Sequence, residues 1–302
     1  MNAGQITVPQ PHGPVARKDA DGVPHRLPYP HGLPYRQDDP AWGGDLMWDR
    51  DLVIEADVQL NGRPRDEAES LMRAFSDGNT IGNEGCQLTS MAMVLRLLAP
   101  RSSTPWTPGR LNEAAHQFYY YTPAGLSMTA LYADLVSEVT DGSVQLCLKE
   151  EYLAGVAPWA RQRVNTSALV RAYRSLPPEQ RRDVVVMLKT GTYDDTVASH
   201  YLLLDPRDGG SPNDDNPRVL DPAMPVGETK PWRLSDSAAR ITSDPEIARA
   251  WAESGIEPTQ IGGAWVFARC DPERGRPLVE PLVKAWAAEM AAQADQTSHT
   301  RA

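Results

Sequence analysis

Three features are scarce or missing in this chain of 302 residues, and each excludes a class of protein. Only three cysteines occur, which is too few for a disulfide scaffold and favours a reducing compartment. Long runs of Lys and Arg are missing and the net charge is −10 at pH 7, so we expect no nucleic-acid partner. No stretch approaches the roughly 18 consecutive apolar residues of a membrane-spanning helix, so we expect no membrane span.

The N-terminus also lacks the apolar segment of a secretory signal peptide. We therefore expect a cytoplasmic protein, or one that is exported or packed into a particle without a visible signal. The length suits one large domain or two modest ones. A hydrophobic content of 41% is sufficient for a real core.

Proline, in contrast, is abundant, and eight of the 27 prolines lie in the first 40 residues. Because proline restricts φ and donates no backbone hydrogen bond, we predict an extended arm over residues 1–33. Residues 34–275 are predicted to form one domain. Residues 276–302 are predicted to form an amphipathic helix, over 281–294, and a polar tail. The arm and the terminal helix are the candidate docking elements for a partner protein.

Apolar periodicity separates the domain into helices and strands. Predicted helices cover residues 66–75, 88–99, 108–121, 128–139 and 167–176. Predicted strands cover residues 52–60, 144–148, 184–188, 200–204, 218–220 and 264–268. The first of these strands ends at the turn pair Asn61-Gly62, and residues 78–85 are expected to be a polar loop. Because most helices precede most strands, the pattern favours an α+β fold over alternating βαβ units.

The segment GNEGCQLTSMAMVLRLLAP (82–100) places Cys86 at the start of an apolar helical run. Free cysteine is commonly a small buried hydrophobe. A helix N-terminus, however, stabilises a thiolate, and Gly82 and Gly85 would let the backbone approach a substrate closely. Cys86 is therefore a candidate nucleophile as well as a candidate core residue.

Six histidines are candidates for binding a metal or moving a proton. Four lie in the arm or the tail: His12, His25, His31 and His299. The arm has no cysteine or acidic partner at ligand spacing, so we expect no metal site there. His116 lies in an apolar helical segment and is expected to pack. His200 opens an apolar strand after a polar loop, which makes it the candidate base for Cys86.

A catalytic imidazole needs a second group to orient it. Asp221 ends the short apolar stretch 218–220 and precedes Pro222, so the chain should be extended there. If the strands at 200–204 and 219–221 pair as antiparallel neighbours, His200 and Asp221 come close. The alternative for Asp221 is a turn residue.

The segment around Cys86, TIGNEGCQLTSMAMVL (80–95), resembles the nucleophile segment of bacteriocin-processing-type cysteine peptidases and their bacterial and phage relatives in the papain-like superfamily. Three further segments resemble motifs of that family in chain order: PYRQDDPAW (34–42), SHYLLLD (199–205) and RVLDPA (218–223). The likeness covers roughly residues 34–268. It is most specific around Cys86, because that motif is the longest.

The resemblance implies a papain-like α+β fold and hydrolysis of amide bonds in a peptide or protein substrate. It implies Cys86 as nucleophile, His200 as general base and Asp221 as the carboxylate that orients it. Gln37 would donate a hydrogen bond to the oxyanion, together with the backbone N–H of Cys86. No cofactor or metal is implied.

Three departures from the family pattern affect these assignments. Gln87-Leu88 replaces Gly-Pro after the cysteine, and Gln87 is a competing amide for the oxyanion. A predicted strand, turn and helix are inserted between Gln37 and Cys86. The polar stretch 207–217 lengthens the connection between the two site strands and is expected to be a flexible surface excursion.

Two other functions remain open beside hydrolysis. The same residues would support transfer of the acyl group to an amine, as in transpeptidation or transglutaminase-like crosslinking. The domain could instead be an inactive papain-like module that binds a partner or belongs to a particle, although the intact set of Cys86, His200 and Asp221 favours an enzyme. Cys147 and Cys270 are both expected to be structural, with a surface thiol as the alternative for Cys270. The three tyrosines at 119–121 are expected to pack, with a substrate subsite as the alternative.

Overall fold

A computed structural model gives the fold for part of the chain. It describes residues 33–73, 78–99, 105–117, 120–122, 125–126, 135–151, 168–190, 200–208, 211, 214, 216–225, 228, 232–254, 261–271, 273 and 276–299. The extended arm predicted for residues 1–33 therefore lies outside the described residues, except for Leu33. Most of the helix predicted over 128–139 also lies outside them, and only its end, residues 135–138, is seen as helical.

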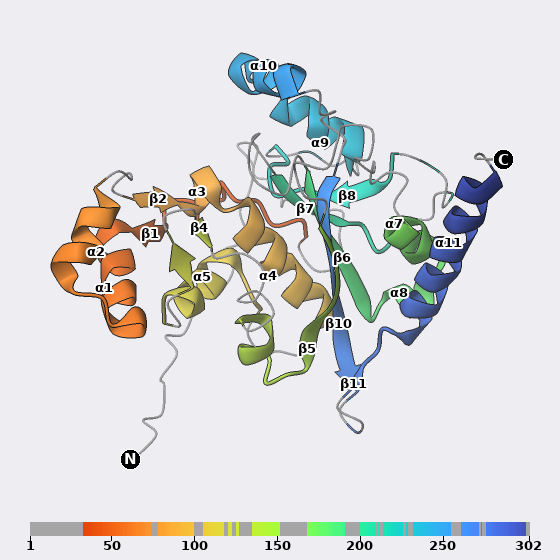
Figure 1. The fold of residues 1–302 in the computed structure, drawn as a ribbon, viewed down its shortest axis with the longest axis horizontal. Coiled ribbons are helices and arrows are strands. Elements are labelled where there is room, and N and C mark those ends of the chain that lie inside the picture. The colour runs from red at the N-terminus through yellow and green to blue at the C-terminus, as the bar shows by residue number, and fades with distance from the viewer. Residues whose placement is uncertain are drawn as a thin grey trace, which may run out of the picture.

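An antiparallel sheet of seven strands forms the centre of the described fold (Figure 1). Its strands are β5 (Val144–Glu151), β6 (Val184–Thr190), β7 (His200–Leu204), β8 (Arg218–Leu220), β9 (Trp232–Arg233), β10 (Ile261–Asp271) and β11 (Arg276–Pro277). The order is β11-β10-β6-β7-β8-β9, and β5 also pairs with β10. The predicted pairing of the two site strands is confirmed, because Leu203 lies opposite Leu220 and Leu204 opposite Val219.

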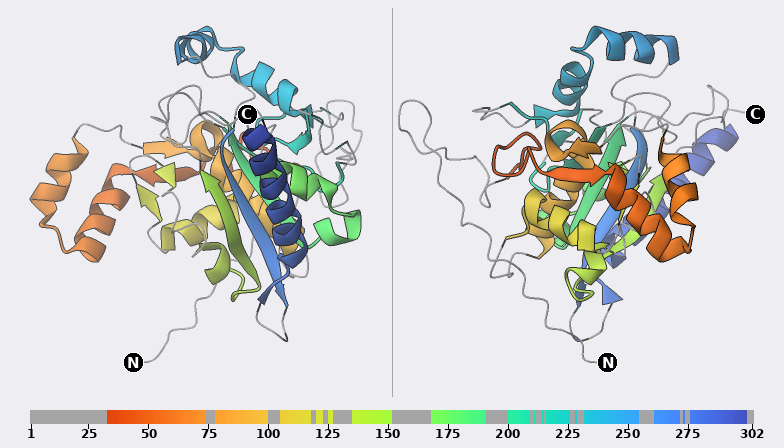
Figure 2. Two further views of the ribbon diagram at one scale, coloured as in Figure 1. Left: turned by 45° about the vertical axis from the view of Figure 1, so that its right-hand side comes forward. Right: turned by 90° about the vertical axis from the view of Figure 1, so that its left-hand side faces the viewer.

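Helices cover both faces of this sheet (Figures 1 and 2). The helices are α1 (Arg50–Asn61), α2 (Arg65–Met72), α3 (Ile81–Glu84), α4 (Cys86–Leu98), α5 (Pro108–Gln117), α7 (Ala168–Ser175), α8 (Pro178–Arg181), α9 (Leu234–Ile241), α10 (Pro245–Ser254) and α11 (Glu280–His299). Helix α4 packs on one face against β6 and β7, while α7 and α11 pack together on the other.

Strand β6 shows why both faces of the sheet are packed against helices. Every residue of β6 is buried, and side chains alternate across a strand. Val185 and Met187 belong to the hydrophobic cluster around α4, whereas Val186 and Leu188 belong to the cluster under α7 and α11. An unbroken apolar strand is stable only between two layers. The predicted α+β class is confirmed as a mixture of helices with antiparallel sheets.

The predicted order of helices before strands holds only in part. The short strands β1 (Leu46–Asp49) and β2 (Gly78–Thr80) pair with each other before α3 begins. Another short pair, β3 (Tyr121–Thr122) and β4 (Gly125–Leu126), follows α5. Helices α7 and α9 lie between strands that run in the same direction, because the chain must return to the starting end of the sheet before such a strand begins.

The strand predicted over residues 52–60 is wrong, because the structure has helix α1 there. The carboxylate of Asp49 caps this helix by accepting the N–H of Leu52 at 2.8 Å. Gly62, read as part of a hairpin turn, ends the helix with a φ of +65°. The polar loop predicted over 78–85 is also wrong, since β2 and α3 occupy it.

Helix α11, which contains the predicted terminal helix, packs against the domain. Leu282 is fully buried in the cluster that contains α7. Arg171 of α7 and Glu289 of α11 form an ion pair at 2.9 Å. The left-hand view of Figure 2 shows α11 running alongside the sheet. The division of the chain at residue 276 stays a prediction.

Candidate functional site

Cys86 is held by the most buried helix of the fold. In α4 all residues except Cys86, Arg96 and Leu97 are buried, so packing on all sides fixes the helix axis. Cys86 is the first residue of this helix and is itself half-buried. The first N–H groups of a helix have no partner within it and carry partial positive charge, which favours an anion at this position.

The turn before Cys86 depends on two glycines. A Cβ on Gly85 would lie 2.3 Å from the carbonyl oxygen of Ile81, and a Cβ on Gly82 would lie 2.8 Å from that of Gly43. The N–H of Gly82 donates to the same Gly43 oxygen at 2.8 Å. Glycine at these two positions therefore allows close backbone contacts within the chain. The sequence interpretation had assigned the glycines to the approach of a substrate instead.

His200 and Asp221 form the central contact of the site. Nε2 of His200 lies 2.6 Å from Oδ1 of Asp221, and this oxygen also accepts the N–H of Ala223 at 2.7 Å. Asp221 is 0% exposed and His200 is 7% exposed. Extending the register of β7 and β8 by one residue places Asp221 on the same side of the sheet as His200, two residues along.

Electrostatics favour a charged pair. Burial alone would lower the pKa of His200, but the charge and hydrogen bond of Asp221 and the side chain of Cys86 together raise the pKa to about 10. Burial alone would raise the pKa of Asp221, but the charge and hydrogen bond of His200 outweigh it, and the pKa is lowered. Both shifts favour an imidazolium beside a carboxylate.

Cys86 interacts with the same imidazole, by a side-chain hydrogen bond that contributes to the raised pKa of His200. Because Nε2 faces Asp221, Nδ1 is the ring nitrogen left for the sulfur. The structure thus brings together Cys86, His200 and Asp221, from the start of α4, the start of β7 and the end of β8.

Gln37, predicted from the resemblance alone, also lies in the site. Its backbone N–H donates to the carbonyl of Pro222 at 3.0 Å, and its side-chain Nε2 donates to the carbonyl of Gly82 at 3.0 Å. Arg36 reinforces this contact, because its Nε donates to the carbonyl of Met224 at 2.8 Å. The segment before α1 therefore bridges the Asp221 strand and the turn before Cys86.

The segment inserted between Gln37 and Cys86 leaves this bridge intact, because β1, α1, α2 and β2 fold to one side of it (Figure 1). The competing amide, Gln87, is 8% exposed, and its Nε2 has no hydrogen-bond partner among the described residues. Only Gln37 has its amide tied to the turn that precedes Cys86.

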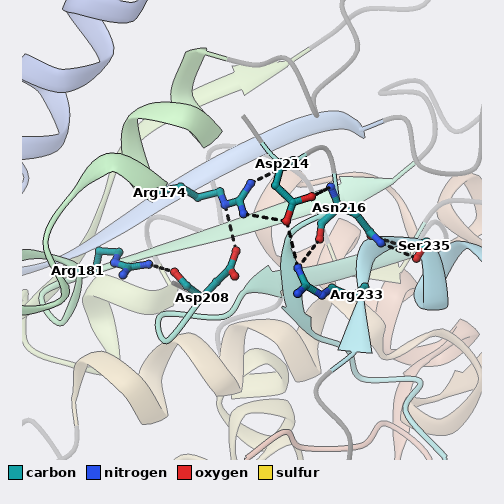
Figure 3. Close-up of polar contacts among 7 residues, drawn as sticks. All are labelled: Arg174, Arg181, Asp208, Asp214, Asn216, Arg233 and Ser235. Atoms are coloured by element: carbon teal, nitrogen blue, oxygen red, sulfur yellow. Dashed lines mark hydrogen bonds and ion pairs between the residues drawn. The ribbon is translucent and has the colours of Figure 1, made fainter. Parts of the chain in front are cut away.

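The described residues of the connection between β7 and β8 include two that bind side chains of another layer, Asp208 and Asp214, which the expectation of a surface excursion did not include. Asp208 is 2% exposed and forms an ion pair with Arg174 of α7 at 3.0 Å. Its carbonyl accepts a hydrogen bond from Arg181, and Arg174 also bonds to Asp214 (Figure 3). Arginines of another layer therefore fix the described part of this connection, a fact that polar composition does not reveal.

The remaining candidates lie in other surroundings. His116 Nε2 contacts the carbonyl of Leu46 at 2.9 Å, and its ring packs on Tyr121. Tyr120 and Tyr121 are buried, as packing required, while Tyr119 lies outside the described residues. Cys147 is half-buried in β5. Cys270 is 6% exposed because β10 pairs on both sides there, so it is buried as a structural cysteine would be and is not a surface thiol.

No family model, curated protein or solved structure matches this chain. Across the residues that the structure describes, no helix has the length and apolar character needed to cross a membrane. In the same residues, no three His, Cys, Asp or Glu side chains gather as a metal site would require. The function is therefore argued from the geometry of the site.

One residue at the site was missed by the sequence interpretation. Ser237 of α9 is fully buried, and its hydroxyl contributes to the lowered pKa of Asp221. Residues 232–241 contain several small and polar residues, so the sequence offers no signal that singles out Ser237.

Proposed function

We propose that this protein is a cysteine peptidase that hydrolyses amide bonds through a thioester intermediate. The observation that carries the proposal is the buried 2.6 Å contact of His200 with Asp221, in an imidazole that also interacts with Cys86. A nucleophilic cysteine is activated by a base within hydrogen-bond reach, and that base is oriented by a third group.

In the proposed reaction the thiolate of Cys86 attacks the carbonyl carbon of the substrate, and an electron pair moves to the carbonyl oxygen. Protonated His200 gives its proton to the leaving amine as the C–N bond breaks, so the acyl group stays on Cys86 as a thioester. Water then attacks the thioester and gives a proton to His200 while the C–S bond breaks. The raised pKa of His200 supports its role as the acid of the first step.

The oxyanion of each step needs donors that are fixed in advance. In the proposal these are the side-chain amide of Gln37 and the backbone N–H of Cys86. One amide hydrogen of Gln37 binds the Gly82 carbonyl, which leaves its second hydrogen for the substrate. An amide donates without adding a charge beside the thiolate.

The papain-like fold belongs to this proposal. Support comes from a buried helix that begins at Cys86 and packs against an antiparallel sheet carrying His200 and Asp221. The chain order of Gln37, Cys86, His200 and Asp221 matches the order that the resemblance implies. The proposed substrate class is a peptide or a protein.

Alkylation of Cys86 by iodoacetamide tests the proposal, with the modified cysteines read by mass spectrometry from pH 5 to 9. We expect fast labelling of Cys86 well below pH 8.5, where an unperturbed thiol titrates, and its loss in a His200→Ala variant. Cys147 and Cys270 serve as internal controls, because burial raises the pKa of Cys147 to about 12 and also raises that of Cys270.

Labelling of Cys86 that is no faster than that of the two control thiols, and indifferent to His200, would overturn the proposal in favour of a binding module. The activity itself is measured on a mixture of unstructured peptides, as new C-termini that appear with the wild type and not with Cys86→Ala. An added amine found on those C-termini would identify acyl transfer instead of hydrolysis.

A further inference from the structure

The two carboxylate oxygens of Asp221 differ in their hydrogen bonds. Oδ1 accepts hydrogen bonds from His200 and Ala223, at 2.6 and 2.7 Å. Oδ2 is buried and accepts no hydrogen bond from the residues that the structure describes. A buried carboxylate oxygen without a donor is destabilising, so a donor is expected nearby.

Ser237 carries a hydroxyl that can act as this donor. Leu234, Ser237 and Ala238 form the buried side of α9, at the spacing of one helical face. A hydroxyl on such a face is unfavourable unless it has a partner. The Oγ atom of Ser237 and Oδ2 of Asp221 are both buried, and neither makes a hydrogen bond of normal geometry with the described residues. Ser237 nevertheless lies near enough to help lower the pKa of Asp221.

The start of α9 is fixed to the strand that ends at Asp221. Trp232 of β9 pairs with Val219 of β8, and the N–H of Leu234 donates to the carbonyl of Pro217 at 3.0 Å. Asn216 and Ser235 exchange two hydrogen bonds, at 2.8 and 2.9 Å (Figure 3). Ser237 is the next residue but one after Ser235.

The charged cluster of Figure 3 extends this anchor to a second layer of the fold. Arg233 donates to the carbonyl of Asn216 at 2.8 Å and pairs with Asp214 at 3.2 Å. Arg174 of α7 also binds Asp214. The start of α9, which carries Ser237, is therefore held against residues 214–219, which lead to Asp221.

We propose that Ser237 is a positioning residue for the site: its hydroxyl donates to Oδ2 of Asp221 and keeps Oδ1 directed at His200. With both oxygens hydrogen-bonded, the plane of the Asp221 carboxylate is fixed. Its Oδ1 atom then stays in contact with the imidazolium of His200. Ser237 acts through Asp221 and touches neither the sulfur nor the substrate. The inference rests on the proposed function, because it concerns the same triad.

The test compares two side chains of nearly equal shape. Ser237→Thr keeps the hydroxyl, whereas Ser237→Val replaces it with a methyl group. Ser243→Ala is the matched control, because Ser243 is exposed just after α9 and its hydroxyl bonds only within that turn. The readout is the pH profile of Cys86 alkylation by iodoacetamide, with the melting temperature of each variant recorded by circular dichroism.

We expect Ser237→Thr and Ser243→Ala to keep the wild-type profile. In Ser237→Val the labelling of Cys86 at pH 6 should become about tenfold slower, while labelling at pH 9 changes less. The physical reason is that a less firmly held carboxylate stabilises the imidazolium less, which favours the neutral thiol and imidazole.

A double-variant comparison shows whether the effect passes through the carboxylate. In an Asp221→Asn background, Ser237→Val should cause no further change in the profile. An equal shift in that background, or equal profiles for Ser237→Thr and Ser237→Val, would overturn the inference. A wild-type profile that does not depend on His200 would overturn the proposed function instead, so the two failures are distinguishable.

Discussion

At the scale of single residues, the protonation of His200 links the site to the stability of the fold. The pKa of His200 rises from 6.5 to about 10, since Asp221 and Cys86 outweigh the effect of burial. Between these values the folded state holds a proton that the unfolded state releases. The contribution of His200 to stability is therefore fully present below pH 6.5 and is lost as the pH rises toward 10.

We expect the free energy of unfolding of the wild type to fall between pH 6.5 and 10, and to fall less in a His200→Gln variant. Urea denaturation at pH 6.5, 8 and 10 measures both proteins, and their difference removes the titration of other groups. Parallel curves would contradict the raised pKa. Asp221 acts at the opposite end: its pKa is lowered from 3.8, so its contribution is present above that pH and is lost in acid.

Gln37 and Gln87 are the two candidate amides for the oxyanion of the proposed reaction. If Gln37 is the donor, Gln37→Ala should lower kcat for peptide hydrolysis by roughly 10²–10³. Alkylation of Cys86 should stay at the wild-type rate, because displacement at the carbon of iodoacetamide creates no oxyanion. Gln87→Ala is the matched control. A larger loss of kcat in Gln87→Ala than in Gln37→Ala would reverse the assignment.

At the scale of elements, a buried ion pair joins the connection between β7 and β8 to helix α7. The side chains of Arg174 and Asp208 are 1% and 2% exposed, and they lie 3.0 Å apart. The two site strands pair only through a few residues, so this connection decides how firmly they are held together. An ion pair in such surroundings helps to define one arrangement of the loop, while its removal leaves unpaired buried charge.

Arg174→Met should lower the free energy of unfolding by about 3–5 kcal/mol, because the buried carboxylate of Asp208 would lose the charge of Arg174. Arg249→Ala is the control, since the Arg249–Glu253 pair is 69% and 72% exposed and spans 3.9 Å. An exposed pair contributes at most about 1 kcal/mol. Urea denaturation at pH 7 compares the two. Equal effects would show that the cluster of Figure 3 does not stabilise the fold.

At the scale of the whole molecule, one sheet separates two hydrophobic clusters. The cluster around α4 supports Cys86, and the cluster under α7 and α11 covers the opposite face. The sheet is common to both, since alternate residues of β6 enter each cluster. Damage to the face under α11 should therefore lower stability without changing the site in the folded protein.

Leu282→Ala should lower the free energy of unfolding by about 2–5 kcal/mol, because Leu282 is fully buried on that face. Val283→Ala, next to it and 37% exposed, is the control and should have a much smaller effect. The alkylation profile of Cys86 should be unchanged in both variants. A shift of that profile in Leu282→Ala would show that the two clusters are coupled through the sheet.

The sequence correctly predicted several elements whose pattern of apolar residues is visible within a short stretch of chain. Helical spacing after Cys86 predicted α4, and the apolar run at 184–188 predicted β6. The segment 52–60 misled, because its alternating pattern also fits a helix that buries Val53 and Ile54. Asp49 caps this helix and so favours the helix over the strand. A single local hydrogen bond of that kind is not visible in the periodicity of the sequence.

The sequence by itself also determined which chemistry the site can hold, since only a few residue types can act as nucleophile, base and orienting group. The tertiary structure alone decided how they are arranged. Gln37 reaches Gly82 and Pro222 across 45 and 185 positions of the chain, and Ser237 reaches Asp221 from a different element. The physical reason is that such contacts follow from the packing of whole layers, whereas periodicity and spacing report only neighbours along the chain.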